Sequence, residues 1–375
     1  MRVAIVAEYY PRRDDPVLGV WAHRQALATQ AAGANVEVFV LHRVGGRQRG
    51  TLRAQLRQPS VATLDGLEIN YVRYAAPPRP WSYGWWGAFA APPLRRAMSA
   101  RGPFDLVHAH NAVPAADAAR RGRGDAPMVV SVHGGDVLWT SSRVPRGGAA
   151  VARAFRASAL VLANSAGIEQ LARANGARQT RVVHLGTDIP ALGGPRSAGP
   201  LVASVGHLVA RKRHDDVLRA IAQVPGVRFL IIGDGPQRDP LERLARELGV
   251  ADRVEFAGAL APAKALERSR EAWLFAMPSS EEAFGVAYIE AMAAGIPAIG
   301  CAGEPGPAEI AAAGEGMVLV PARDPSALAT ALRRLLGDEP ALTALGRAAR
   351  ETVEREFTWE RCGVQTLAAY RDAAR

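Results

Sequence analysis

Short apolar runs recur along the chain, and stretches with a helical pattern separate each run from the next. Apolar runs of about 4–8 residues, bounded by turn residues, are typical of strands buried in a parallel sheet. We expect a first series of strands at 3–7, 36–41, 67–74, 104–108, 128–132, 160–163 and 181–184, and a second at 201–205, 229–232, 254–257, 273–277 and 317–320. This alternation predicts an α/β fold with two parallel-sheet lobes.

A stretch rich in proline and glycine separates the two series. It covers 186–200 and contains the sequence IPALGGPRSAGP, which fits neither a helix nor a strand. We therefore predict an N-terminal lobe over 1–190, a C-terminal lobe over 191–358 and a terminal helix over 359–375. A chain of 375 residues is long enough for two domains with separate cores. Its two cysteines, Cys301 and Cys362, exclude a disulfide framework and a Cys-rich metal site.

The segment 278–300, PSSEEAFGVAYIEAMAAGIPAIG, carries the clearest functional pattern in the chain. It predicts a loop, a short helix and a buried strand. Ser279 and Ser280 can cap the start of the helix, and Gly295 with Pro297 can end it. The small and apolar residues of the helix suit close packing against a sheet.

Two acidic residues interrupt this apolar segment. Glu282 lies in the loop before the helix and Glu290 lies within it, where a carboxylate costs free energy unless it is hydrogen-bonded. The free N–H groups at the helix start, beside Phe284 and Gly285, favour an anion. A lone glutamate more often has a structural role. Two of them flanking a glycine-bearing helix start favour a site for a polyol and a phosphate.

A basic cluster follows the first strand of the second series. Gly206 comes directly after that strand, and Arg211, Lys212 and Arg213 precede a helix expected over 215–222. The chain has no G-x4-G-K-[ST] motif, so side chains rather than a phosphate-binding loop would neutralise a diphosphate.

The first strand lacks the glycine-rich turn of nicotinamide-binding enzymes. Gly19 is the one glycine near the start of the helix expected over 20–32, which argues against a dehydrogenase. Another strand ends at His133, followed by two glycines and Asp136. Ligands bind at the carboxyl ends of strands in open α/β sheets, so this histidine can donate to a sugar hydroxyl or stabilise a developing charge. The alternative is a histidine bonded to the backbone at the strand end.

The spacing Glu282-x7-Glu290, within SSEEAFGVAYIEAMAAGIPAIG, resembles the signature of the family 4 retaining glycosyltransferases, and the resemblance extends over essentially the whole chain. It implies the GT-B fold, in which two Rossmann-like lobes enclose a cleft and the C-terminal helix crosses back to the first lobe. It also implies transfer of a sugar from a nucleoside-diphosphate sugar to an acceptor, with retention of anomeric configuration.

The resemblance also implies roles for matching residues. His133-Gly-x-Asp136 resembles the family's H-G-x-D segment, and Lys212 matches the lysine of G-R-L-x-x-x-K, in which His207 replaces the usual arginine. The catalytic residues it implies are His133, Glu282 and Lys212. The donor-binding residues it implies are Gly19, Gly206, His207, Arg211, Lys212, Gly258, Phe284, Gly285, Val286 and Glu290. Because basic side chains would meet the diphosphate and no Asp-x-Asp motif ends a strand, we expect no metal and no cofactor.

Positive charge is concentrated in the N-terminal half of the chain. Residues 1–190 contain 24 Lys and Arg against 12 Asp and Glu, whereas residues 191–375 contain 22 against 24. A positive lobe attracts anionic partners such as phospholipid or acidic glycan. The alternative is an arginine-rich proteome whose proteins all have such surfaces.

An aromatic segment lies in the same half, with Trp81, Tyr83, Trp85, Trp86 and Phe89 among Arg79, Arg95 and Arg96. It fits an interfacial membrane segment, a proline-broken loop that packs its tryptophans into the lobe, or a wall of the acceptor site. We expect Asp136, Trp85 and Trp86 on the acceptor side.

The chain shows no signal-peptide pattern and no uninterrupted apolar run of about 18 residues. We therefore expect a cytoplasmic enzyme, peripheral at the inner face of the membrane, that serves cell-envelope or polysaccharide synthesis. Its expected partners are a nucleotide-sugar donor and a glycan or lipid-linked acceptor, not nucleic acid. The alternatives are a sugar-nucleotide 2-epimerase of the same architecture and a non-catalytic nucleotide-sugar-binding protein.

Overall fold

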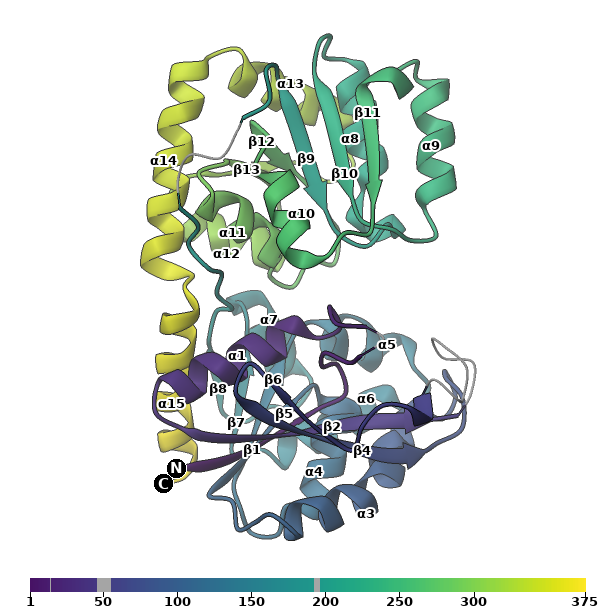
Figure 1. The fold of residues 1–375 in the computed structure, drawn as a ribbon, viewed down its shortest axis with the longest axis vertical. Coiled ribbons are helices and arrows are strands. Elements are labelled where there is room, and N and C mark those ends of the chain that lie inside the picture. The colour runs from purple at the N-terminus through teal and green to yellow at the C-terminus, as the bar shows by residue number, and fades with distance from the viewer. Residues whose placement is uncertain (14, 46–54, 192–195) are drawn as a thin grey trace. The chain divides into compact units, whose positions relative to one another are not determined.

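The computed structural model describes residues 1–13, 15–45, 55–191 and 196–375, which form two compact units (Figure 1). The first unit comprises Met1–Leu185 and Trp359–Arg375, and the second comprises Gly186–Thr358. The expected α/β fold with two parallel-sheet lobes is confirmed. The predicted linker lies at this division, with its residues 192–195 outside the described part of the chain.

The first unit is built on an eight-stranded sheet with the order β3-β4-β2-β1-β5-β6-β7-β8. Its strands are β1 (Arg2–Ala7), β2 (Asn35–Val44), β3 (Val61–Leu64), β4 (Leu67–Ala75), β5 (Leu106–His110), β6 (Met128–Val132), β7 (Leu160–Ala163) and β8 (Thr180–Val182). All neighbours are parallel except β3, which pairs antiparallel with β4. The sequence does not reveal β3, because this edge strand has no fully buried residue to produce an apolar run.

The helices of the first unit follow the βα alternation. They are α1 (Val20–Ala31), α3 (Trp86–Ser99), α4 (Asp117–Gly122), α5 (Ser141–Arg143), α6 (Gly147–Arg156), α7 (Ala166–Ala174) and α15 (Trp359–Ala373), with short helical turns η1 (Tyr83–Trp85), η2 (Ala112–Ala116) and η3 (Gly135–Thr140). Ser165 caps α7, since its hydroxyl accepts from the Ile168 N–H.

Helix α15 is last in the chain but packs on the first unit, beside α1 (Figure 1). Gly363 permits the close approach, because a Cβ there would lie 2.1 Å from the Ala28 carbonyl oxygen. Gln25 Nε2 donates to Thr366 Oγ1 at 3.0 Å, and Tyr370 is fully buried in the core of this unit. The expected return of the terminal helix to the first lobe is confirmed.

The second unit has a six-stranded parallel sheet with the order β11-β10-β9-β12-β13-β14. Its strands are β9 (Leu201–Val205), β10 (Arg228–Ile232), β11 (Val254–Gly258), β12 (Leu274–Ala276), β13 (Ala298–Cys301) and β14 (Met317–Val320). Its helices are η4 (Ala210–Lys212), α8 (His214–Ala222), α9 (Arg238–Glu247), η5 (Ala251–Arg253), α10 (Pro262–Ser269), α11 (Val286–Ala293), α12 (Pro305–Ala313), α13 (Pro325–Leu336) and α14 (Glu339–Glu356). The strand order reverses between β9 and β12, which is where open α/β sheets bind ligands.

The segment 278–300 forms the expected loop, helix and strand, but the predicted serine cap is wrong. Helix α11 begins after Gly285, whose φ of 89° lies in the left-handed region that glycine adopts without strain. Ser280 lies in the preceding loop, where its N–H and hydroxyl both donate to the Arg211 carbonyl. The end of the helix at Gly295, with φ 78°, agrees with the prediction.

The aromatic segment forms η1 and α3 rather than a loop, and α3 contains Pro92 and Pro93. Trp86 is fully buried, with its ring edge-on to Tyr83 and Tyr74. The prediction that Trp86 faces an acceptor is therefore wrong, because the side chain belongs to the core of the lobe.

Candidate active site

The loops that follow β9 and β12 meet where the strand order of the second sheet reverses. Lys212, at the end of η4, places its Nζ 2.6 Å from Glu282 Oε2, and both side chains are largely buried. The backbone fixes the two loops to each other, since the Ser280 N–H donates to the Arg211 carbonyl at 2.7 Å. Two of the three predicted catalytic residues thus form a shielded ion pair at the expected edge of the sheet.

Glycines at the ends of β9 to β11 bring the backbone close to this ion pair. The Gly233 N–H donates to the Gly258 carbonyl at 2.9 Å, and a Cβ at Gly233 would lie 1.9 Å from the Gly206 carbonyl oxygen. A Cβ at Gly206 would instead make only ordinary contacts, at 3.6 Å from Met277 Sδ and 3.7 Å from Lys212 Cε. Gly206 is therefore not required by packing, and it leaves space beside the lysine.

Three further basic residues surround Lys212, and the structure distinguishes them. Arg213 donates two hydrogen bonds to the Asp216 carboxylate, at 2.8 and 2.9 Å, so its charge is already offset. His207 is exposed, with Nδ1 2.6 Å from the Asp234 carbonyl oxygen. Arg211 is exposed, and no carboxylate within the described ranges pairs with it. Arg211 is thus better placed than Arg213 to compensate for the arginine that His207 replaces.

Helix α11 begins directly after the loop that carries Glu282. Its first turn contains no acidic residue, and no side chain caps it, so its first N–H groups remain available to an anion. Phe284 is buried edge-on to Phe357, with ring centroids 5.7 Å apart, which fixes the entry to the helix. Val286, the first helical residue, is half-buried. The predicted grouping of Glu282, Phe284, Gly285 and Val286 is thus one continuous turn.

Glu290 lies in α11, where burial and, as the smaller cause, the nearby Asp188 carboxylate together raise the pKa of its carboxyl to about 7. Within the described part of the chain, no side chain or N–H donates a hydrogen bond to it. A largely desolvated carboxyl without a donor is suited to accept hydroxyl groups of a ligand.

The third predicted catalytic residue, His133, lies in the first unit at the end of β6. Its Nε2 is 3.0 Å from His110 Nδ1, and the two rings are parallel, with centroids 5.2 Å apart. Burial lowers the pKa of His133 to about 4, so the ring is neutral near pH 7. Its Nδ1 is buried and has no hydrogen-bond partner among the residues that the structure describes. A neutral imidazole can exchange a hydrogen bond with a sugar hydroxyl, but it does not bring a positive charge.

Asp136 and Trp85 differ in their access to a ligand. Asp136 is buried and accepts from Asn111 Nδ2 at 3.1 Å. Burial raises the pKa of Asp136 to about 6, although the Ala112 and Val113 N–H groups and Asn111 favour its ionised form. We assign it to positioning the loop that carries His133. Trp85 is partly exposed, with the Arg146 guanidinium 4.6 Å from its ring centroid.

The backbone conformation and packing explain why position 19 is a glycine, and the sequence alone does not reveal this. Its φ is 66°, and a Cβ there would lie 2.2 Å from the carbonyl group of Tyr9. The start of α1 therefore packs directly on the loop after β1, and a donor diphosphate is not needed to explain the glycine.

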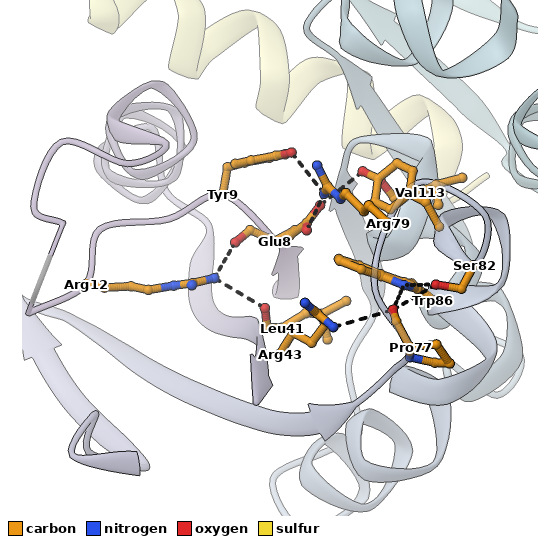
Figure 2. Close-up of polar contacts among 11 residues, drawn as sticks. Glu8, Tyr9, Arg12, Leu41, Arg43, Pro77, Arg79, Ser82, Trp86 and Val113 are labelled. Atoms are coloured by element: carbon orange, nitrogen blue, oxygen red, sulfur yellow. Dashed lines mark hydrogen bonds and ion pairs between the residues drawn. The ribbon is translucent and has the colours of Figure 1, made fainter. Parts of the chain in front are cut away.

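The sequence analysis missed a buried charged cluster at the end of β1 (Figure 2). Glu8 Oε1 lies 2.8 Å from Arg79 Nη2, and the Tyr83 hydroxyl donates to Glu8 Oε2 at 3.1 Å. The Arg79 guanidinium also lies 4.0 Å from the Tyr83 ring centroid. The position of Glu8, directly after a buried strand, is the signal that would have identified it.

Metal independence remains a prediction. Within residues 1–13, 15–45, 55–191 and 196–375, no three His, Cys, Asp or Glu side chains are grouped so as to hold a metal ion.

Two family profiles match adjoining parts of the chain. Residues 18–190 match "Glycosyltransferase Family 4" and residues 190–352 match "Glycosyl transferases group 1". D-inositol 3-phosphate glycosyltransferase of Mycolicibacterium smegmatis is 33% identical over 76% of this chain and 71% of its own length.

Two other relatives match over less of their length. The chain spans 22% of an exopolysaccharide phosphotransferase of Streptomyces coelicolor, with 37% identity over 53% of the chain. It spans 62% of the lipopolysaccharide core biosynthesis glycosyltransferase LpsE of Rhizobium meliloti, with 31% identity over 55% of the chain.

Solved structures of the same fold match the whole chain. Sucrose-phosphate synthase of Thermosynechococcus elongatus superimposes with a TM-score of 0.79 at 23% identity, covering 99% of this chain and 98% of that one. HepE of Anabaena, solved in complex with UDP-glucose, superimposes with a TM-score of 0.75 at 21% identity, covering all of both chains.

Proposed function

The chain belongs to the family 4 glycosyltransferases of the GT-B fold, and from this premise we propose that it transfers a sugar from a nucleoside-diphosphate sugar to an acceptor hydroxyl with retention of configuration. The observation that carries the proposal is the Lys212–Glu282 ion pair, which lies at the strand-order reversal beside the open start of α11.

Each part of this site suits one part of such a donor. Lys212 has three ammonium hydrogens, and its contact with Glu282 leaves others for the diphosphate, with Arg211 alongside. Glu282 and the N–H groups at the start of α11 would hold the sugar hydroxyls, and Glu290 would accept from the ribose. His133 would contact the sugar as a neutral ring.

The proposed reaction needs no carboxylate nucleophile. The acceptor oxygen bonds to the anomeric carbon as the bond from that carbon to the diphosphate oxygen breaks. The acceptor proton passes to the departing diphosphate on the same face of the sugar. Catalysis would then depend on stabilising the leaving group, and one well-placed donor to developing charge contributes on the order of 10²–10³ in rate.

The lysine provides a direct test with a matched control. The Lys212→Met variant should lose both transfer activity and the thermal stabilisation that UDP, GDP or their sugars give the wild type. Lys264, the other lysine of the chain, pairs with Glu267 on the surface of α10. The Lys264→Met variant should behave as wild type. Equal activity in Lys212→Met and wild type would refute the assignment. Turnover should also survive excess chelator, because side chains replace the metal.

The two alternatives make different predictions in the same assay. A 2-epimerase would convert the sugar nucleotide without an acceptor, and a binding protein would be stabilised by it without turnover. UDP-glucose is a rational first donor, because HepE was solved with it.

We propose a glycan or lipid-linked acceptor of cell-envelope or polysaccharide synthesis, met at an anionic membrane surface. Trp81 is 75% exposed, and Trp85 and Phe89 are also partly exposed. No described helix is long and apolar enough to span a bilayer. Each arginine near an anionic surface contributes about 1 kcal/mol, screened by salt.

This membrane contact can be tested with vesicles. Binding to anionic vesicles should fall as ionic strength rises and fall again in the Trp81→Ala, Trp85→Ala variant, which spares the buried Trp86. Equal binding to neutral and anionic vesicles would contradict the proposal.

A further inference from the structure

The first unit contains a pocket of about 560 Å³ that the proposed reaction does not use. The loop after β1, the first turns of α1 and the β3–β4 hairpin enclose it. Its lining includes neither Glu8 nor His133, although Arg12, which lines it, also donates to the Glu8 carbonyl. Its volume lies within the range of about 300–1,000 Å³ typical of small-molecule sites.

Positive charge dominates the polar part of the lining. Four arginines contribute to it, Arg12, Arg13, Arg24 and Arg57, against a single carboxylate, Asp65. That carboxylate is already bound, since its Oδ2 lies 2.8 Å from His23 Nε2. The pocket therefore has a surplus of cationic groups, and guanidinium groups favour phosphate and carboxylate ligands.

The arginines differ in the groups that contact their side chains. Arg12 Nη2 donates to the backbone carbonyls of Glu8 and Leu41, at 2.9 and 3.4 Å (Figure 2), and its charge also acts on the Glu8 carboxylate. The Nε of Arg12 is buried, and no described residue forms a hydrogen bond with it. Arg13 and Arg57 are exposed, and neither has a carboxylate partner in the described part of the chain. Among the described residues, no carboxylate therefore competes with an anion for these two arginines.

The rest of the lining is apolar and held in place. Pro11, Val20 and Leu64 form walls of the pocket. The Tyr71 hydroxyl donates to the Pro11 carbonyl at 2.8 Å, and the Arg13 N–H donates to Gln58 Oε1 at 3.2 Å. These bonds tie the loop after β1 to the hairpin, so the pocket needs little ordering to bind.

We propose that this pocket binds a phosphate group joined to an apolar chain, with the phosphate on Arg13 and Arg57 and the chain along the apolar walls. The inference rests on the proposed function, because such a ligand would be the anchored end of a lipid-linked acceptor. A phosphate alone would leave the apolar walls unused, and a neutral lipid would leave the arginines uncompensated.

The test uses the full chain and three probes, decyl phosphate, inorganic phosphate and decyl maltoside, each below its micelle concentration. We expect decyl phosphate to bind in calorimetry at least tenfold more tightly than either other probe. The Arg13→Gln, Arg57→Gln variant should lose at least tenfold in affinity for decyl phosphate. The Arg153→Gln, Arg178→Gln variant, which removes two exposed arginines elsewhere in the unit, should bind as wild type.

Three outcomes would overturn the inference. They are equal binding of decyl phosphate to both double variants, inorganic phosphate binding as tightly as decyl phosphate, and equally tight binding of decyl maltoside. Stabilisation by nucleoside diphosphates is measured in the same proteins and should persist in the Arg13→Gln, Arg57→Gln variant. If nucleoside diphosphates do not stabilise the wild type, the proposed function is refuted. If they stabilise the wild type but decyl phosphate does not bind to it, only the proposal for the pocket is refuted.

Discussion

At the scale of single residues, environment separates side chains that the sequence presents as alike. Glu282 and Glu290 flank the same helix start, but Glu282 is paired with Lys212 at 2.6 Å, whereas Glu290 has no donor among the described residues. Burial, with a smaller contribution from Asp188, raises the pKa of Glu290 to about 7. The spacing in the sequence predicted that both acids matter, and the structure shows which of them is left unsatisfied.

Glu290 should make stability depend on pH. The ordinary pKa of a glutamate is 4.5, and the folded value is about 7. As pH rises between these values the unfolded chain loses its proton first, so this residue lowers stability as pH rises and has no further effect above pH 7. The Glu290→Gln variant should therefore gain stability over wild type from pH 5 to 8 in urea denaturation, while binding nucleoside diphosphate more weakly. A stability difference that does not change with pH would contradict the raised pKa.

The glycines that follow β9 and β10, Gly206 and Gly233, should respond differently to substitution by alanine. A Cβ at Gly206 finds only ordinary contacts, whereas one at Gly233, with φ 144°, would lie 1.9 Å from a backbone oxygen. Gly206→Ala should fold with nearly unchanged stability but lose nucleotide affinity, because the methyl group occupies the space beside Lys212. Gly233→Ala should lose about 1–3 kcal/mol of stability, the usual cost of overpacking. A Gly206→Ala variant that binds as wild type would show that the diphosphate does not use this space.

At the scale of elements, the sequence predicted the strands that appear as apolar runs, but it did not predict features that depend on tertiary packing. Buried strands such as β1, β6 and β9 appear as apolar runs and were located closely. Strand β3 has too little apolar character to be recognised. Helix α9 was not predicted either, although Leu241, Leu244 and Ala245 lie at helical spacing and pack on the core. The start of α11 was misplaced because a left-handed glycine, rather than a serine, begins the helix. Glu8 and Arg79, 71 residues apart, meet only through the fold.

The contact between α15 and α1 is a prediction at this scale. A Cβ at Gly363 would lie 2.1 Å from the Ala28 carbonyl oxygen, so Gly363→Ala should destabilise the protein despite alanine's better helix propensity of about 1 kcal/mol. We expect a net loss of about 1–2 kcal/mol in urea denaturation, because backbone cannot move aside as a side chain can. Val364 is exposed on the same helix, and Val364→Ala is the control. Equal stability of the two variants would refute close packing at Gly363.

At the scale of the whole molecule, the chain consists of two units with separate cores, and α15 links its last residues to the first of them. Charge follows this division, since the excess of basic over acidic residues lies in 1–190. The groups proposed to hold the nucleotide, Lys212, Arg211 and Glu290, all belong to the second unit. The pocket proposed for a phosphate with an apolar chain belongs to the first.

This division predicts how ligands change thermal unfolding of the full chain. A ligand that binds only folded protein raises stability by RT ln(1 + [L]/Kd), about 2.7 kcal/mol at a hundredfold excess over Kd. In scanning calorimetry, UDP or GDP should raise the transition of the unit that binds it, and decyl phosphate should raise the other. The Lys212→Met variant should abolish only the first shift, and the Arg13→Gln, Arg57→Gln variant only the second. The two sites would not be independent if both ligands shifted one single transition and if each variant abolished the shift by both ligands.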